Sequence, residues 1–186
     1  MASQAPANVL PLFFSDLAPL SSQVHATWKA KPMEKAAFFA TSHAIPVTID
    51  EFAVAQRFYP IIFSVGDEPV PLALMGLNEG VNTFTNDEGQ LLGETYVPAY
   101  VRRYPFLLAR LRDDSDELSL CFDPSSGALG EFEDGDALFD GDQPSEATKN
   151  ILKFCEEFEQ AGHRTTAFVK ELLDLGLLMD GEVAIQ

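Results

Sequence analysis

The stretch IIFSVGDEPVPLALMGL, residues 61–77, contains two short apolar runs separated by Gly66-Asp67-Glu68-Pro69. These residue types favour tight turns, since glycine adopts a positive φ, aspartate hydrogen-bonds to nearby backbone and proline fixes φ. Apolar runs of strand length on both sides of such a turn are typical of a β-hairpin. The sequence therefore predicts a hairpin here, and we expect further strands to form around it.

Further strands are predicted on both sides of this hairpin. Val81 to Thr85 and Gln90 to Leu92 flank the turn Asn86-Asp87-Glu88-Gly89 and predict a second hairpin. Glu117 to Phe122 alternates apolar with small residues, which is the pattern of a half-buried strand. The remaining predicted strands are Ala37 to Ala40, His43 to Val47 and Phe106 to Arg112. Residues 37–40 and 43–47 form a short pair, and the strands from residue 61 to residue 122 indicate a mostly antiparallel sheet of about five or six strands.

Helical patterns lie before and after most of these strands. Thr48-Ile49-Asp50-Glu51 matches a capping box, in which each side chain bonds to the backbone N–H of the other residue. It predicts a short helix through Phe58 that stops before Pro60. Near the C-terminus, apolar residues recur at helical spacing on both sides of Gly162, and glycine commonly ends helices. The predicted fold class is therefore α+β, a mostly antiparallel sheet with a short inserted helix and a C-terminal helical hairpin.

Length and composition fit a single folded domain over residues 1–186. A chain of this length, with 46% apolar residues and 15 Phe, is expected to bury roughly two-thirds of its unfolded surface. Such a composition excludes a disordered acidic tail. Residues 1–32 are rich in proline and show little periodicity, so we expect an extended N-terminal arm laid over the domain. Leu17, Leu20 and Trp28 are its expected anchors.

The chain is strongly acidic. It has 12 Lys and Arg against 29 Asp and Glu, a formal net charge of −17, and residues 113–146 contain no Lys or Arg at all. A field of this sign opposes binding to nucleic acid, which needs cationic side chains to displace counterions. It favours a basic protein or a cationic peptide as the partner. The identity of that partner and the oligomeric state are unknown from the sequence.

Neither a signal peptide nor a membrane span is predicted. Met1 to Ser15 is uncharged, but it has no basic leading segment and is interrupted by Pro6 and Pro11. Cys121 and Cys155 have neither C-x-x-C nor metal-ligand spacing, and we expect them to be buried thiols. The expected location is the cytoplasm, with the cell surface as the alternative if the chain is exported by a non-Sec route.

No catalytic or cofactor-binding motif is found. His25, His43 and His163 are dispersed and form no pair with the spacing of zinc ligands. The G-x-S-x-G, Walker and G-x-G-x-x-G motifs are absent, so no cofactor is expected. This favours a non-enzymatic protein and leaves an enzyme, or an accessory subunit of an enzyme, as the alternative.

Two Asp-Gly-Asp sequences, Asp134-Gly135-Asp136 and Asp140-Gly141-Asp142, lie in the acidic segment. Their carboxylates beside flexible glycines make a weak calcium candidate. Counted from Asp134, however, an EF-hand loop would have Leu138 at its fifth position and Phe139 at the sixth, where glycine is needed. We therefore expect no metal site but a solvated acidic loop, with Leu138 and Phe139 packed beneath it and a turn at Asp140-Gly141.

Residues 96–106, YVPAYVRRYPF, combine three Tyr, two Pro and two Arg. The candidate ligand-binding residues in this segment are Tyr100, Arg102, Arg103 and Tyr104. A guanidinium offers forked donors to a carboxylate or phosphate, and a phenol adds a hydroxyl. The alternative is structural: Pro98 begins a single helical turn and Pro105 ends it, with the tyrosines at the core edge and the arginines near acidic surface.

Several segments share motifs with one known family. They are Leu20-Ser21-Ser22 with His25, HAIPV at 43–47 leading to Glu51-Phe52, YPIIF at 59–63, LNEGVNTF at 77–84, YVPAYVRRYPF at 96–106, LCFD at 120–123 and LFD at 138–140. From about Leu20 to Leu178 the chain resembles the SapC family of bacterial proteins, which is distinct from the transporter permeases of that name. The family name comes from a surface-layer protein associated with serum resistance. The resemblance implies no catalytic residues, because most members have no established biochemical role.

These observations lead to a hypothesis about function. We expect a SapC-like protein that acts without catalysis, through binding or surface assembly, with a basic protein or cationic peptide as its partner. The alternative is a small-ligand-binding enzyme or enzyme accessory protein that uses residues 96–106.

Overall fold

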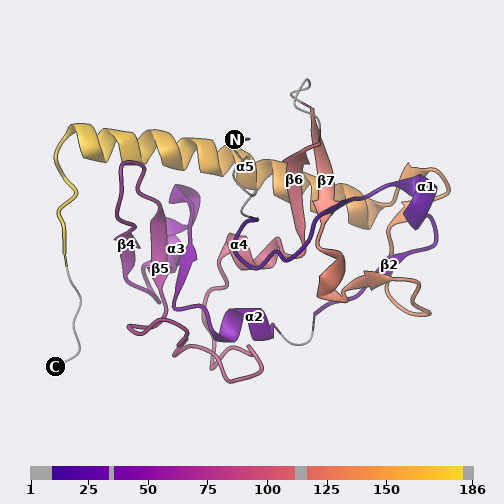
Figure 1. The fold of residues 1–186 in the computed structure, drawn as a ribbon, viewed down its shortest axis with the longest axis horizontal. Helices are drawn as coiled ribbons and strands as arrows, with labels where there is room; N and C mark the ends of the chain where they lie inside the picture. The colour runs from indigo at the N-terminus through magenta and orange to yellow at the C-terminus, as the bar shows by residue number, and fades with distance from the viewer. Residues whose placement is uncertain (1–9, 34–35, 112–116, 182–186) are drawn as a thin grey trace, which may run out of the picture.

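The structure, a computed structural model, describes residues 10–33, 36–111 and 117–181. One long helix runs across two small antiparallel sheets, and the remaining strands lie beside them (Figure 1). The helices are α1 (Ser22–His25), α2 (Ala37–Ala40), α3 (Phe52–Ala55), α4 (Ala99–Arg102) and α5 (Glu146–Asp174), with 3₁₀ turns η1 (Ile49–Glu51) and η2 (Pro124–Ser126). The strands are β1 (Ala18–Pro19), β2 (Lys29–Ala30), β3 (Ala44–Pro46), β4 (Ile61–Phe63), β5 (Pro71–Leu74), β6 (Phe106–Arg110), β7 (Leu118–Phe122), β8 (Leu129–Gly130), β9 (Asp136–Ala137), β10 (Phe139–Asp140) and β11 (Gln143–Pro144).

The predicted hairpin within residues 61–77 is confirmed. β4 and β5 pair antiparallel with Ile62 opposite Leu72, and the turn between them contains Gly66 at a φ of 115°. β3 pairs with the other side of β5, so the strand order of this sheet is β3-β5-β4. Ile45 of β3 and Ala73 of β5 are fully buried in the main core cluster. This sheet is the platform for the site described below.

The strands predicted within residues 106–122 are found as β6 and β7, which pair antiparallel with Leu108 opposite Leu120. The N-terminal segment contributes β1, which pairs with the free side of β7. It also contributes β2, which pairs with both β8 and β9. Backbone pairing as well as apolar anchors therefore holds this segment against the rest of the chain.

The α+β fold class is confirmed, but the single sheet of five or six strands is wrong. The described strands divide into sheets of two or three, in the orders β1-β7-β6, β8-β2-β9, β3-β5-β4 and β10-β11. These strands are short, and α4 lies between β5 and β6 along the chain, so no hydrogen-bond ladder continues from one sheet to the next. The hairpin predicted over residues 81–92 is reduced to one bridge between Thr85 and Leu91.

Residues 37–40 form the helix α2 and not the predicted strand. The Phe39 N–H donates to the Ala36 carbonyl at 2.7 Å, which is a helical turn contact. Alanine is the strongest helix former, and a four-residue apolar run has too few residues to show a strand or helix period. The local composition therefore outweighs the apolar pattern here.

The predicted C-terminal helical hairpin is also wrong, because α5 is one helix of 29 residues that continues through Gly162. A glycine inside a helix costs only about 1 kcal/mol relative to alanine. The buried stripe of Ala161, Thr165 and Val169 continues at helical spacing past it. The residue that ends the helix is Gly176, with a φ of 65°, and the Leu177 N–H then donates to the Leu172 carbonyl at 3.0 Å.

Two local predictions about helical turns are confirmed. Thr48 and Glu51 form the capping box that starts η1 and α3. Pro98 precedes the single turn α4, and Pro105 follows it with β6 beginning at the next residue. No helix in the described ranges combines the length and the apolar character that crossing a membrane requires.

Candidate functional site

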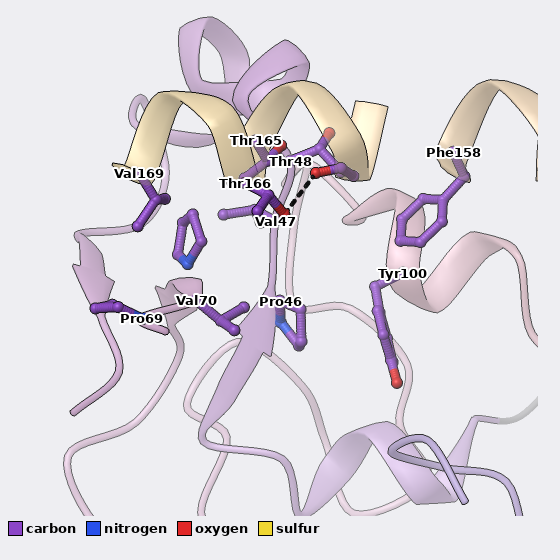
Figure 2. A pocket seen from close by; sticks show the side chains of 12 residues that line it. Pro46, Val47, Thr48, Pro69, Val70, Tyr100, Phe158, Thr165, Thr166 and Val169 are labelled. Carbon is purple, nitrogen blue, oxygen red and sulfur yellow. Dashed lines mark hydrogen bonds between the residues drawn. The ribbon is translucent and has the colours of Figure 1, made fainter. Parts of the chain in front are cut away.

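A groove lies between the C-terminal half of α5 and the β3-β5-β4 sheet, and we call it the α5 groove (Figure 2). Its inner part has a volume of about 200 Å³ and is lined by Pro46, Val47, Thr48, Pro69, Val70, Pro71, Tyr100, Phe158, Gly162, Thr165, Thr166 and Val169. Its outer part has a volume of about 420 Å³ and is lined by Asp67, Glu68, Pro69, Val70, Thr166, Val169, Lys170 and Leu173. Because the two parts share four lining residues, they form one continuous groove.

Strand pairing and one helix contact fix the walls of the α5 groove. The Val47 N–H donates to the Pro71 carbonyl at 3.0 Å, which holds the end of β3 against the start of β5. The Ile49 N–H in η1 donates to Thr165 Oγ1 on α5 at 2.9 Å, across 116 residues of sequence. Figure 2 shows Thr165, Thr166 and Val169 on the underside of α5, facing the sheet residues Pro46 and Val70.

The hydroxyl groups of the α5 groove already have partners within the chain. Thr165 donates to the Ala161 carbonyl at 2.7 Å and Thr166 to the Gly162 carbonyl at 3.2 Å. Thr48 Oγ1 donates to the Glu51 carboxylate at 2.9 Å. A polar ligand would have to compete with these bonds, whereas an apolar side chain would gain contact without breaking any. The inner groove therefore offers a ligand mainly apolar surface.

Gly162 leaves a gap in the helical wall of the α5 groove. A Cβ built at this position meets no heavy atom within 4 Å, so packing does not require glycine there. Its backbone is helical, so φ does not require glycine either. Glycine inside a helix is unfavourable by about 1 kcal/mol relative to alanine. The absence of a side chain at Gly162 therefore has one remaining effect, which is to make the α5 groove wider at this position.

The aromatic end of the groove rests on a buried arginine. The Arg103 guanidinium carbon lies 4.4 Å from the centre of the Tyr100 ring and 4.5 Å from that of Phe158, within cation–π range. Arg103 is 8% exposed, and it forms an ion pair with Glu159 at 3.6 Å. Since both rings line the groove, Arg103 supports the wall from behind.

The four candidate residues of 96–106 do not form one clamp. Tyr100 and Arg103 lie together at the groove wall, as described above. Arg102 is exposed and donates from Nε to the Val97 carbonyl at 3.0 Å and from a terminal nitrogen to the Tyr96 hydroxyl at 3.1 Å. Tyr104 lies in a separate core cluster with Phe14. Their role in binding a small ligand stays a prediction.

Two tyrosines next to buried carboxylates have raised pKa values. Burial and then the charge of Asp123, 3.4 Å from the hydroxyl, raise the pKa of Tyr104 to about 12. Burial and then Glu51, 2.9 Å away, raise the pKa of Tyr96. Both phenols therefore stay protonated at neutral pH and act as hydrogen-bond donors to the carboxylates.

Residues 133–144 of the acidic segment are exposed except for one apolar pair. Leu138 and Phe139 are buried, as predicted, and Gly141 at a φ of 62° makes the turn between β10 and β11. The candidate calcium ligands Asp134, Asp136, Asp140 and Asp142 are all exposed. Within the described ranges, no three His, Cys, Asp or Glu side chains lie close enough to hold a metal ion.

Sequence reasoning missed the groove because its walls come from distant segments. The sequence predicts a helix end at Gly162 and a strand that ends at Val47, and it gives Val169 no role. A signal was present in the apolar pattern, since Thr165 and Val169 continue the stripe of α5 beyond Gly162 at a spacing of four. If the stripe is taken as continuous through Gly162, the pattern places this glycine on the buried side of a single helix.

Cys121 and Cys155 are free, buried thiols, as predicted. Burial raises the pKa of Cys121, and it raises that of Cys155 to about 11. Because the thiolate is the reactive form, we expect a disulfide reagent such as DTNB to modify the native chain at least about a hundredfold more slowly than the chain in 6 M guanidinium. Rapid release of one equivalent of thionitrobenzoate from native protein would contradict this assignment.

A family model described as SapC matches residues 20–186 of the chain. No curated protein and no solved structure matches the chain. The match begins in the N-terminal segment and includes every residue that lines the α5 groove.

Proposed function

The chain belongs to the SapC family, and from this premise we propose that it is a non-enzymatic binding protein whose α5 groove receives apolar side chains of a partner protein. The observation that carries the proposal is the gap at Gly162, a position where neither packing nor φ calls for glycine. Hydrophobic grooves that take the apolar side chains of a peptide are a recurring form of peptide-binding surface.

The polar groups of the groove support binding over catalysis. Catalysis needs a nucleophile, acid or base that is free to contact the reacting atoms. The inner groove has hydroxyls that are bonded within the chain, and its other lining side chains are apolar apart from Tyr100. Tyr100 donates to the Leu12 carbonyl at 3.3 Å. These groups are suited to shaping an apolar surface.

The test is a substitution that fills the groove without disturbing the fold. Gly162→Trp places a large side chain where nothing lies within 4 Å of the Cβ. Peptides selected from a random dodecapeptide library on the full chain are expected to be rich in apolar residues. We expect their affinity to fall at least about tenfold in G162W, since the ring occupies the volume that an anchor side chain needs. Fluorescence polarisation with labelled peptides measures the change.

Ala167→Trp is the matched control, because Ala167 is exposed on the same helix and does not line the groove. It lies about 140° around the helix from Gly162. A167W should bind the selected peptides as the wild type does, and circular dichroism should show that both variants keep the native helix content. Equal binding of the selected peptides to G162W and A167W would overturn the proposed function.

A further inference from the structure

The outer part of the α5 groove has charge at its edge as well as apolar surface. Asp67 and Glu68, in the turn between β4 and β5, line it on one side, and Lys170 of α5 lines it on the other. Both carboxylate residues are exposed. In the part of the chain that the structure describes, neither carboxylate forms an ion pair, and the two carboxylates outnumber the one lysine of this lining.

Apolar side chains beside these carboxylates are open to solvent. Val70 and Leu173 line the outer groove and are 44% and 42% exposed. Val65, in the same turn as Asp67, is 94% exposed. A segment that leaves the inner groove would therefore pass over apolar surface with two carboxylates at its side.

We propose that the occupant of the α5 groove is a basic, apolar peptide segment, in which a bulky apolar side chain enters at Gly162 and Lys or Arg side chains next to it meet Asp67 and Glu68. This inference rests on the proposed function and adds the charge of the partner. Charge complementarity carries it, since oppositely charged rims attract the correct partner and repel others. The net charge of −17 acts in the same direction over longer distances.

A second copy of the chain fits the groove less well than a basic segment. Two copies each carry a net charge of −17 and repel one another. The approach of any acidic segment to Asp67 and Glu68 adds like charges at short range. The negative charge of the chain thus favours a cationic partner over self-association.

The experiment uses three dodecapeptides that share the same leucine positions and carry lysine, serine or glutamate at all the others. Each is labelled and titrated with the full chain and with the double variant D67K/E68K. The matched control is D134K/D142K, which makes the same change in net charge at exposed positions in the acidic segment. In Figure 1 that segment lies near β2, at the opposite end of the molecule from β4.

We expect the lysine peptide to bind most tightly, and its affinity to fall about tenfold in D67K/E68K but less than about threefold in D134K/D142K, because nearby exposed charges act more strongly than distant ones. The loss should be smaller in 0.5 M salt. Equal weakening by both double variants would mean attraction by net charge alone and would overturn the inference. Tighter binding of the glutamate peptide would overturn it too.

The outcomes separate this inference from the proposed function. If the serine and lysine peptides bind equally and both are lost in G162W, the groove binds a neutral apolar segment and only the charge assignment fails. If no peptide responds to G162W, the proposed function fails and the inference fails with it. A dimer in sedimentation velocity that G162W dissociates would identify a second copy as the occupant and would also overturn the inference.

Discussion

Replacement of Asp123 by alanine is expected to lower the free energy of unfolding by about 4 kcal/mol, because at least three hydrogen bonds to a buried, charged acceptor are lost at once. The side chain is 0% exposed. Its carboxylate accepts from the Ser15 N–H at 2.7 Å, and from the Ser125 N–H and hydroxyl at 2.8 and 2.6 Å. It also receives the longer bond from Tyr104. Urea denaturation followed by circular dichroism measures the loss.

The physical reason for this size is that Asp123 joins segments that are distant in sequence. Ser15 belongs to the N-terminal segment, and its bond to Asp123 spans 108 residues. Asp123 also caps the 3₁₀ turn η2 through Ser125. In the alanine variant the buried Tyr104 hydroxyl and the partly buried bonds of Ser15 and Ser125 all lose their charged acceptor, and the link between the two segments is lost with them.

Two controls isolate the carboxylate. Asp123→Asn keeps the side-chain volume and one acceptor oxygen, so it should lower the free energy of unfolding by about half as much as Asp123→Ala. Asp136→Ala, at an exposed position, should change the free energy of unfolding by less than about 0.5 kcal/mol. A loss below 1 kcal/mol in D123A would contradict the described network.

The pH dependence of the same variants has a defined sign. Burial raises the pKa of Asp123, but hydrogen bonds from Ser125, Ser15 and Asp16 outweigh burial and hold the pKa below its ordinary value of 3.8. A lowered pKa in the folded state contributes stability that is complete above the unfolded pKa and is lost as the pH falls through the folded pKa. The difference in stability between wild type and D123N should therefore be constant from pH 7 to 5 and narrow below about pH 4.

The features that were predictable from sequence depend on neighbouring residues. The β4–β5 hairpin follows from four turn residues between two apolar runs, and the capping box follows from Thr48 and Glu51 three residues apart. The single turn α4 follows from Pro98 and Pro105 in the same way. In each case the groups that stabilise the structure are close in sequence, so their spacing is enough to identify them.

The features that were not predictable depend on packing between distant segments. Gly162 lies inside α5 because the apolar stripe on both sides of it packs against the rest of the chain, and this outweighs the local preference of glycine. The α5 groove exists because η1 binds Thr165 across 116 residues. No local sequence pattern contains that contact. The sequence therefore indicates a ligand clamp in residues 96–106, whereas the structure indicates the α5 groove, which Tyr100 helps to line.

Replacement of Glu51 by alanine is expected to lower the free energy of unfolding by about 3 kcal/mol, because its buried carboxylate connects η1 to α4 and the loss leaves donors unpaired. Glu51 is 5% exposed. One oxygen accepts from the Thr48 N–H and hydroxyl, both at 2.9 Å. The other accepts from the Tyr96 hydroxyl at 2.9 Å and the Ala99 N–H at 2.6 Å. Chemical denaturation monitored by circular dichroism gives the size of the loss.

Variants of two nearby residues show whether the loss of stability in E51A depends on the place of Glu51 in the sequence or on the burial of its carboxylate. Asp50 is adjacent in sequence, but its ion pair with Arg164 joins two half-exposed side chains, so Asp50→Ala should cost less than about 1 kcal/mol. Tyr96→Phe removes one of the four donors to Glu51 and should cost about 1 kcal/mol. In the double variant E51A/Y96F the two losses should not add, because both remove the same bond. Full additivity would show that the Tyr96 hydroxyl does not stabilise the fold through Glu51.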